Sequence, residues 1–367
     1  MAEVLGPVPG PGILDIELYV PGEAKIEGTA KPARLASNES ALGPSPRAVA
    51  ALRQFAGEMH RYPEGDSATL RTALGRVHGL DPERIVCGAG SDELIALLLR
   101  AYATGPDAEV LYSRHGFLMY AIGSLAVGAK PIAVPERNLT FDVDATLAHV
   151  NERTRLVFIA NPNNPTGTYL PEREVARLAA GLPPHVVLVI DAAYAEFVNR
   201  NDYEPGVSLV DKHPNVVMLR TFSKIYAMAA LRLGWGYFPP AIADVMNRVR
   251  GPFNVSAAAQ VAGLAALEDA DALRRAQAHN NEWLPWLSGR LAGLGLEPTA
   301  SVGNFVLPCF PADGKHDADS AFDFLLSRHI IARKMGGYGL PDRIRITIGT
   351  AEENHKVAAT LAEFMAS

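Results

Sequence analysis

Cysteines, basic runs and long apolar segments are scarce in this sequence of 367 residues. The two cysteines, Cys87 and Cys309, lie in apolar surroundings without metal-ligand spacing, which predicts reduced thiols, with a disulfide as the less favoured alternative. No stretch approaches the ~20 apolar residues of a membrane span, and no secretory signal pattern begins the chain, so we expect a cytoplasmic protein without a membrane partner. A net charge of −6 argues against nucleic acid as the main partner.

Several catalytic signatures are also missing. The chain has no Ser-His-Asp order, no Walker loop, no zinc spacing and no internal repeat, and GAGSDE (88–93) lacks the G-x-G-x-x-G spacing of a dinucleotide site. These absences argue against triad hydrolases, P-loop nucleotidases and nicotinamide-dependent dehydrogenases. The hydrophobic share of 48% and charged share of 20% are those of an ordinary globular protein, and the length predicts two packed domains.

Short apolar runs recur along the first two thirds of the chain and alternate with helical or loop segments. They predict strands near residues 85, 110, 132, 157, 187 and 217. This alternation favours an α/β fold with a mostly parallel sheet and helices on its faces. The proline- and glycine-rich residues 1–45 are expected to form an extended arm, and a long helix near 270–292 is expected to cross into a second domain.

The stretch 216–236 places a lone lysine directly after a predicted strand. Its first part, VVMLRTF, has the β-branched apolar residues of a strand, and its later part, IYAMAALRL, has the composition of a helix. Lys224 lies between them, where a desolvated amine has a lowered pKa and suits Schiff-base chemistry with a carbonyl. The alternative is a lysine whose amine simply reaches water.

Two groups of residues are candidates for a phosphate site. Thr221 and Ser223 precede Lys224, and Arg232 follows it by eight positions, so all three can face one anion. The second group is Gly90, Ser91 and Asp92, where a glycine turn leads from a short strand into an apolar helix. The free N–H groups and the dipole of a helix N-terminus bind anions, although Ser91 alternatively only caps the helix.

Two further motifs follow predicted strands. NPNNPTG (161–167) specifies a rigid turn, but a turn alone gives no reason for Asn164 directly before Pro-Thr-Gly, so we interpret it as a positioned amide. Asp191 ends an all-apolar strand, and ligands of open α/β sheets bind outside the carboxyl ends of the strands. A helix cap is the alternative for Asp191. Lys224 follows 33 residues later at the next strand end, which favours a ligand site.

Together these motifs resemble the fold-type I pyridoxal-phosphate aminotransferases, in the order in which those enzymes carry them. LASNES (35–40) resembles the N-E-N-P segment of the histidinol-phosphate aminotransferases, with Ser40 as a departure, and SAFDFLLSRHIIARKMGGYGLPDRIRITIGT (320–350) resembles their carboxyl-terminal signature. The resemblance implies a large cofactor domain over 46–270 and a smaller α+β domain over 271–367. It also implies a homodimer with active sites at the interface.

The resemblance further implies pyridoxal 5′-phosphate as cofactor and a role for each matching residue. Lys224, Asp191 and Tyr194 become the catalytic residues, Asn164 and Tyr194 share the cofactor's phenolic oxygen, and Phe117 stacks on its ring. The implied phosphate contacts are Gly90, Ser91, Asp92, Thr221, Ser223, Arg232 and, from the neighbouring subunit, Tyr62. The implied substrate contacts are Tyr19, Asn164, Arg333 and Arg345, with Phe117 and Tyr120 also shaping the side-chain pocket.

Three of these residues have plainer interpretations. Tyr62 is alternatively a turn tyrosine packed on the following helix, Phe117 a core aromatic, and Arg345 a solvated arginine on an exposed sheet face. The expected reaction transfers an amino group from histidinol phosphate to 2-oxoglutarate in histidine biosynthesis. The alternatives are an aromatic amino-acid aminotransferase, a phosphothreonine decarboxylase-like enzyme and, more remotely, a noncatalytic ligand-binding relative.

Overall fold

Seven strands form the central sheet of the computed structural model, which describes residues 9–18 and 31–367. In spatial order they are β2 (Ile85–Gly88), β8 (Gly234–Tyr237), β7 (Val216–Thr221), β6 (Val187–Asp191), β5 (Thr154–Ala160), β3 (Glu109–Ser113) and β4 (Lys130–Val134). Six of the seven are the predicted strands, and β8, which was not predicted, pairs antiparallel with both β2 and β7. The prediction of a mostly parallel sheet is confirmed.

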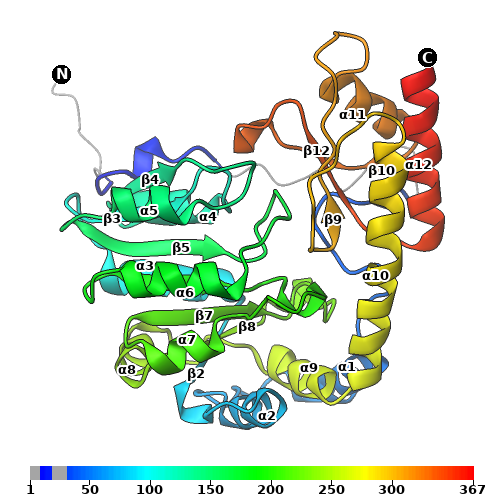
Figure 1. Cartoon of the computed structure of the whole chain (residues 1–367). Coiled ribbons are helices and arrows are strands. Elements are labelled where there is room, and N and C mark those ends of the chain that lie inside the picture. Colours follow the sequence, from blue (N-terminus) through cyan, green and yellow to red (C-terminus); the bar gives the residue numbers. More distant parts are fainter. Residues whose placement is uncertain (1–8, 19–30) are drawn as a thin grey trace, which may run out of the picture.

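Helices cover both faces of this sheet (Figure 1). One face carries α3 (Ser91–Tyr102), α4 (Met119–Ala126) and α8 (Pro240–Val249), and the other carries α2 (Ala68–His78), α5 (Val143–His149), α6 (Glu172–Gly181), α7 (Val207–Lys212) and α9 (Ala257–Leu267). Along β5, Phe158 packs on the first face while Val157 and Ile159 pack on the second. This period of two is that of a strand with both faces buried.

The residues after Lys224 do not form the predicted α-helix. They form a loop with one 3₁₀ turn, Ala229–Leu231, that leads back into β8. Ala227 and Arg232 have left-handed backbone with φ of 56° and 53°, and the Phe222 N–H donates to the Leu233 carbonyl. Ile225, Tyr226 and Met228 are buried in the core although they lie in this loop. Tertiary packing has therefore overridden the helix propensity of alanine, leucine and methionine.

The carboxyl-terminal part forms a separate apolar cluster beside the large sheet. The helix α10 (Ala270–Ala292), at the position predicted, runs along one side of the molecule from α9 and α1 (Pro46–Phe55) to this cluster (Figure 1). The cluster's other elements are α11 (Ala318–Ser327), α12 (Ala351–Ala366), the antiparallel sheet β11 (Arg333–Lys334), β12 (Ile344–Thr347) and β9 (Phe305–Val306), and the parallel pair β1 (Ala33–Arg34) and β10 (Ile330–Ile331).

Because β1 pairs with β10, residues near position 33 of the predicted arm lie on the carboxyl-terminal cluster of their own chain. Backbone bonds continue this contact: the Leu35 N–H donates to the Ile331 carbonyl and the Thr347 N–H to the Leu35 carbonyl. Cys87 and Cys309 are both free thiols. Within the described ranges, no helix has the length and apolar character needed to cross a bilayer.

Candidate active site

An open cavity, about 680 Å³ with the solvent space at its mouth included, lies at the carboxyl ends of β5, β6 and β7. Parallel strands deliver their following residues to the same edge of a sheet, so motifs far apart in sequence meet there. Ten of the predicted site residues line this cavity: Ser91, Asp92, Phe117, Asn164, Asp191, Tyr194, Thr221, Ser223, Lys224 and Arg232.

Asp191 is a buried carboxylate at the end of β6. One of its oxygens, Oδ2, accepts a hydrogen bond of 2.7 Å from the Tyr120 hydroxyl, and the other, Oδ1, accepts from the Ala193 N–H at 3.2 Å. Burial raises the pKa of Asp191 to about 6, and the bond from Tyr120 acts in the opposite direction. The carboxylate lines the cavity, and no α-helix begins at it, so the helix-cap alternative is wrong.

Tyr120 corrects one of our predictions. We expected it to shape the substrate's side-chain pocket, but it is 1% exposed and its ring stacks on Phe158 with centroids 4.6 Å apart. It also meets the ring of Phe117 edge to face at 5.8 Å. Helix α4 turns this side chain into the core, so its hydroxyl contacts Asp191 from the protein side rather than a substrate.

Lys224 extends from the loop after β7 into the cavity. Its amine, Nζ, donates to the Ser37 carbonyl at 3.2 Å and lies 5.7 Å from the centre of the Tyr194 ring. Desolvation lowers the pKa of Lys224 to about 8, and the positive charge of Arg345 acts in the same direction. At this pKa about a tenth of the amine is neutral and nucleophilic at pH 7, far more than for an ordinary lysine.

The amino end of α3 supplies the anion-binding side of the cavity. Gly90 is the N-cap of α3, with φ of 85°, and Ser91 is the first helical residue, so the alternative that Ser91 only caps the helix is wrong. A side chain at Gly90 would lie 2.7 Å from Nη2 of Arg232, and one at Gly234 would lie 2.3 Å from the Ser91 nitrogen. The two glycines thus leave room for the guanidinium and the helix end to face the same space.

Asn164 is the one asparagine of its turn that faces the cavity. Asn161 exchanges two hydrogen bonds with Leu170, of 3.1 and 2.8 Å, and Asn163 donates to Thr166 at 2.8 Å. These two amides brace the turn, while the side-chain oxygen of Asn164, Oδ1, accepts from Nη1 of Arg345. The division matches our interpretation of Asn164 as a positioned amide.

A second open cavity, about 570 Å³ with the adjoining solvent space included, adjoins the first. It shares Phe117, Asn164, Tyr194 and Lys224 with the first cavity and adds Ala36, Ser37, Asn38, Arg333, Tyr338 and Arg345. Arg345 is 6% exposed, and its Nη2 donates to the Ala36 carbonyl at 2.7 Å, so it is not the solvated surface arginine of the alternative interpretation. Two guanidinium groups beside one cavity favour a carboxylate or phosphate ligand.

Apart from Tyr120, two predicted site residues of the described chain, Gly90 and Tyr62, do not line these cavities. Tyr19 lies outside the described residues. Tyr62 is 82% exposed, and its ring stacks on Phe253 with centroids 4.7 Å apart instead of packing on the following helix.

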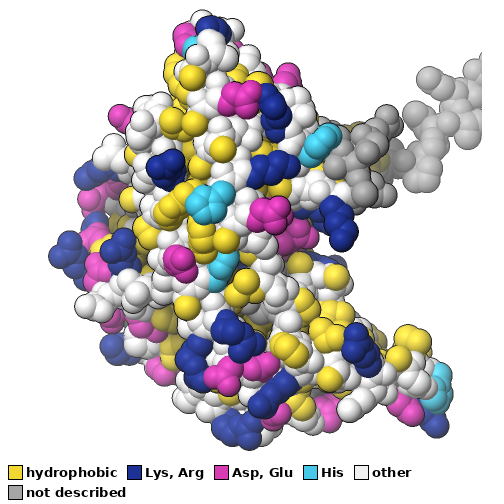
Figure 2. Space-filling model, turned by 90° about the vertical axis from the view of Figure 1, so that its right-hand side faces the viewer, with side chains coloured by type: hydrophobic (Ala, Val, Ile, Leu, Met, Phe, Trp, Pro, Cys, Tyr) yellow, Lys and Arg dark blue, Asp and Glu magenta, His cyan; other side chains and the backbone are white. Residues whose placement is uncertain are grey.

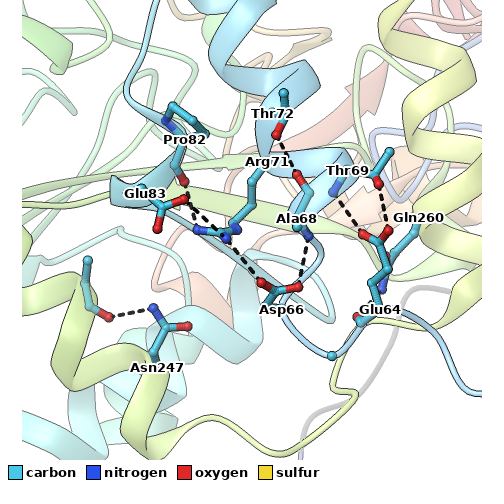
Figure 3. A network of polar contacts seen from close by, with 12 residues as sticks. Glu64, Asp66, Ala68, Thr69, Arg71, Thr72, Pro82, Glu83, Asn247 and Gln260 are labelled. Atoms are coloured by element: carbon cyan, nitrogen blue, oxygen red, sulfur yellow. Dashed lines mark hydrogen bonds and ion pairs between the residues drawn. The ribbon is translucent and has the colours of Figure 1, made fainter.

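The loop before α2 that carries Tyr62 is fixed by a polar network (Figure 3). Glu64 accepts from the Thr69 N–H and hydroxyl at 2.9 and 2.7 Å, and its backbone carbonyl accepts from Gln260 at 3.0 Å. Asp66 pairs with Arg71 at 3.3 Å. Tyr62 is therefore held away from the cavities of its own chain.

Three site residues lie in a segment to which our sequence analysis assigned no contacts. Ala36, Ser37 and Asn38 belong to LASNES, whose resemblance to the N-E-N-P segment was the available signal. Tyr338 and Thr347 were also missed. Thr347 bonds to Asn38 across 309 positions of sequence, a separation that local patterns do not bridge.

The donors around the first cavity fit pyridoxal 5′-phosphate. A phosphate matches the α3 amino end with Ser91, Ser223 and Arg232, an aldehyde matches the amine of Lys224, and a cationic ring nitrogen matches the buried carboxylate of Asp191. Gly90 and Gly234 have no side chain, and this keeps the phosphate side of the cavity open.

Comparisons with known proteins agree with this geometry. The family model for aminotransferase class I and II matches residues 30–361. The chain is 60% identical to a histidinol-phosphate aminotransferase of Paramagnetospirillum magneticum, over 98% of this chain and 99% of that one. It is 55% identical to a histidinol-phosphate aminotransferase of Rhodospirillum rubrum, over 100% of this chain and 99% of that one. A crystal structure of the Sinorhizobium meliloti enzyme with pyridoxal 5′-phosphate has a TM-score of 0.86 and 33% identity, covering 91% of both chains.

Proposed function

The chain belongs to the aminotransferase class I and II family, and we propose that this pyridoxal 5′-phosphate-dependent enzyme transfers the amino group of histidinol phosphate to 2-oxoglutarate in histidine biosynthesis. The observation that carries the proposal is the meeting of Lys224, Asp191, Asn164 and Tyr194 around one cavity. Relatives 52–60% identical over nearly the whole chain have histidinol-phosphate aminotransferase as their name.

When bound, the cofactor supplies an aldehyde for Schiff-base formation and a ring that accepts electrons. Lys224 Nζ would hold the aldehyde and would take the proton from the α-carbon of the amino substrate. Its lowered pKa suits both tasks, because a neutral amine is needed for each. Asp191 would balance the positive charge of the ring nitrogen with its carboxylate, and Asn164 and Tyr194 would orient the phenolic oxygen.

The second cavity is proposed to bind the rest of each substrate. Arg345 binds an anionic group of either amino substrate, glutamate or histidinol phosphate, which lets one pocket serve both half-reactions. Arg333, in the same cavity, is proposed to face the phosphate of histidinol phosphate. Tyr19 is proposed to contact the substrate as well.

A homodimer in the cytoplasm is part of the proposal. Tyr62, 82% exposed, stacks on Phe253, 44% exposed, and Met59, three residues before Tyr62, is 75% exposed. Large apolar side chains that are exposed together mark interaction surfaces. In Figure 2 the molecule is hollowed on one side, and hydrophobic side chains lie along the lower margin of the hollow. A second copy that covers Tyr62 brings this phenol toward the partner's cofactor phosphate.

The substrate is tested by comparing kcat/KM for histidinol phosphate, phenylalanine and tyrosine, each with 2-oxoglutarate as acceptor. Because the guanidinium groups of the site need an anionic partner, the site should discriminate strongly against amines that lack a phosphate. We expect kcat/KM for histidinol phosphate to exceed that for phenylalanine or tyrosine by at least about 100-fold. Arg333→Gln is the matched variant, expected to lower kcat/KM for histidinol phosphate and leave the glutamate half-reaction unchanged. Equal values for the three amines would refute selection of histidinol phosphate, and higher values for phenylalanine and tyrosine would assign the enzyme to aromatic amino acids instead.

A further inference from the structure

Three consecutive residues contact three different residues of the proposed active site. The Ala36 carbonyl accepts from Arg345 at 2.7 Å, the Ser37 carbonyl accepts from Lys224 at 3.2 Å, and the Asn38 side-chain amide donates to the Tyr194 hydroxyl oxygen at 2.8 Å. The first two contacts use the backbone and need no particular side chain. The third depends on the side chain of Asn38, which is 1% exposed and has φ of 54°.

The orientation of the Asn38 amide follows from its contacts with Thr347. The Thr347 hydroxyl oxygen accepts from the Asn38 backbone N–H at 2.9 Å, and its proton is donated to Asn38 Oδ1 at 3.2 Å. Thr347 is 1% exposed, so its hydroxyl proton has no water to bond to. If Nδ2 and Oδ1 of Asn38 exchanged places, this proton would lose its acceptor. Oδ1 therefore faces Thr347, and Nδ2 faces Tyr194.

This orientation decides what the Tyr194 hydroxyl does. Because its oxygen accepts from Asn38 Nδ2, the hydroxyl proton must point elsewhere. In the described part of the chain, no other polar group is hydrogen-bonded to this oxygen, and Tyr194 lines both cavities. The proton is thus available to a ligand in the cavity.

We propose that Asn38 is a positioning residue that directs the Tyr194 hydroxyl proton toward the bound cofactor, and that Thr347 fixes the Asn38 amide for this task. The inference rests on the proposed function, in which Tyr194 donates to the phenolic oxygen. A donor at that oxygen stabilises its negative charge, which lowers its affinity for a proton. Since Thr347 ends β12 and Tyr194 follows β6, the link also makes this donor depend on the position of the carboxyl-terminal cluster.

The test is a pH titration of the absorbance of the bound cofactor. Asn38→Leu removes the amide at nearly constant volume, and we expect the apparent pKa of the bound chromophore to rise by about 0.5 to 1 pH unit. In a Tyr194→Phe background, Asn38→Leu should cause no further rise, because its effect acts through the missing hydroxyl. The inference would be overturned if the chromophore of Asn38→Leu had the wild-type pKa. It would also be overturned if Asn38→Leu raised this pKa by the same amount in the Tyr194→Phe background.

A second pair of variants guards against misfolding of Asn38→Leu. Thr347→Val removes the hydroxyl that holds the amide and should raise the same pKa by a smaller amount, whereas Thr347→Ser keeps the hydroxyl and should titrate like the wild type. Equal titrations for Val and Ser would contradict the role given to Thr347.

Two controls separate this inference from its premise. Asn215→Leu removes another buried amide, which donates to the Val186 carbonyl at 2.8 Å at the opposite end of β7, and should lower stability without moving the titration. A shift there of the size seen for Asn38→Leu would also overturn the inference. Failure of the wild-type protein to bind pyridoxal 5′-phosphate would refute the proposed function itself, before any variant is compared.

Discussion

Two groups of residues meet at the cavities, and they differ in how the fold brings them there. Asn164, Asp191 and Lys224, the strand-end residues, follow neighbouring strands of one sheet. Asn38, Arg345 and Thr347, the arm–β12 residues, come together across 309 positions of sequence. The first group has the amine, carboxylate and amide that the proposed reaction uses. The second group orients the first group and its neighbours through hydrogen bonds: Arg345 donates to Asn164, and Asn38 donates to Tyr194.

This comparison predicts that substitutions among the strand-end residues reduce chemistry most, while those among the arm–β12 residues change binding and proton affinity. The difference arises because a reacting group has no substitute, whereas an orienting hydrogen bond contributes only about 1 kcal/mol.

The largest effect is expected for Lys224→Ala. Loss of the amine removes both the cofactor linkage and the base, so kcat should fall by at least about 10³-fold. Circular dichroism should show an intact fold, because the side chain contributes little to the apolar core. Lys212→Ala, at the end of α7, is the matched control and should retain full activity. Near-normal transamination by Lys224→Ala would remove the distinction between the two groups.

Asp191→Asn should lower kcat by about 10²-fold while the cofactor still binds, because a neutral amide cannot balance the positive ring nitrogen. Tyr120→Phe removes only the hydrogen bond to Oδ2 and should cost about threefold to tenfold. Rapid-mixing measurements of the first half-reaction give both values. If Tyr120→Phe cost as much as Asp191→Asn, the hydroxyl rather than the carboxylate would be the essential group.

Arg345→Lys should raise KM for both amino substrates by about tenfold to 100-fold, with a smaller change in kcat, because an ammonium cannot reproduce the bidentate contact. Steady-state kinetics with glutamate and histidinol phosphate check this. An equal fall in kcat with KM unchanged would place Arg345 with the strand-end residues.

The pH dependence of cofactor capture tests the link between the groups. Since burial lowers the pKa of Lys224 to about 8, the rate at which the cofactor-free protein binds pyridoxal 5′-phosphate should rise about tenfold per pH unit below this value and level off above it. Arg345→Gln removes a positive neighbour, which raises the pKa of the lysine and moves the inflection upward. Stopped-flow absorbance measures it, and an inflection near that of free lysine would contradict the burial effect.

The strand-end residues were predictable because each follows a short apolar strand within its own motif. The sequence around Asp191 and Lys224 contains the strand, its end and the reactive side chain in a few consecutive residues. The hexapeptide LASNES indicated a functional segment, but Asn38 acquires its contact with Tyr194 only when the carboxyl-terminal cluster folds against it.

Two errors have the same physical origin. IYAMAALRL has helical composition, yet Ile225, Tyr226 and Met228 are buried in a loop that returns to β8. Tyr120 was expected in a pocket, yet α4 turns it into the core against Phe158. In both segments, tertiary packing decided the outcome, and local propensity does not contain that information.

The central claim is that the aldehyde of the cofactor is held by Lys224. Borohydride reduction of the cofactor-loaded protein, followed by peptide mass mapping, tests this directly. We predict one cofactor-derived mass addition per chain, on the peptide that contains Lys224, and none in Lys224→Ala. Modification of a different lysine, or no modification of the wild-type protein, would contradict the account.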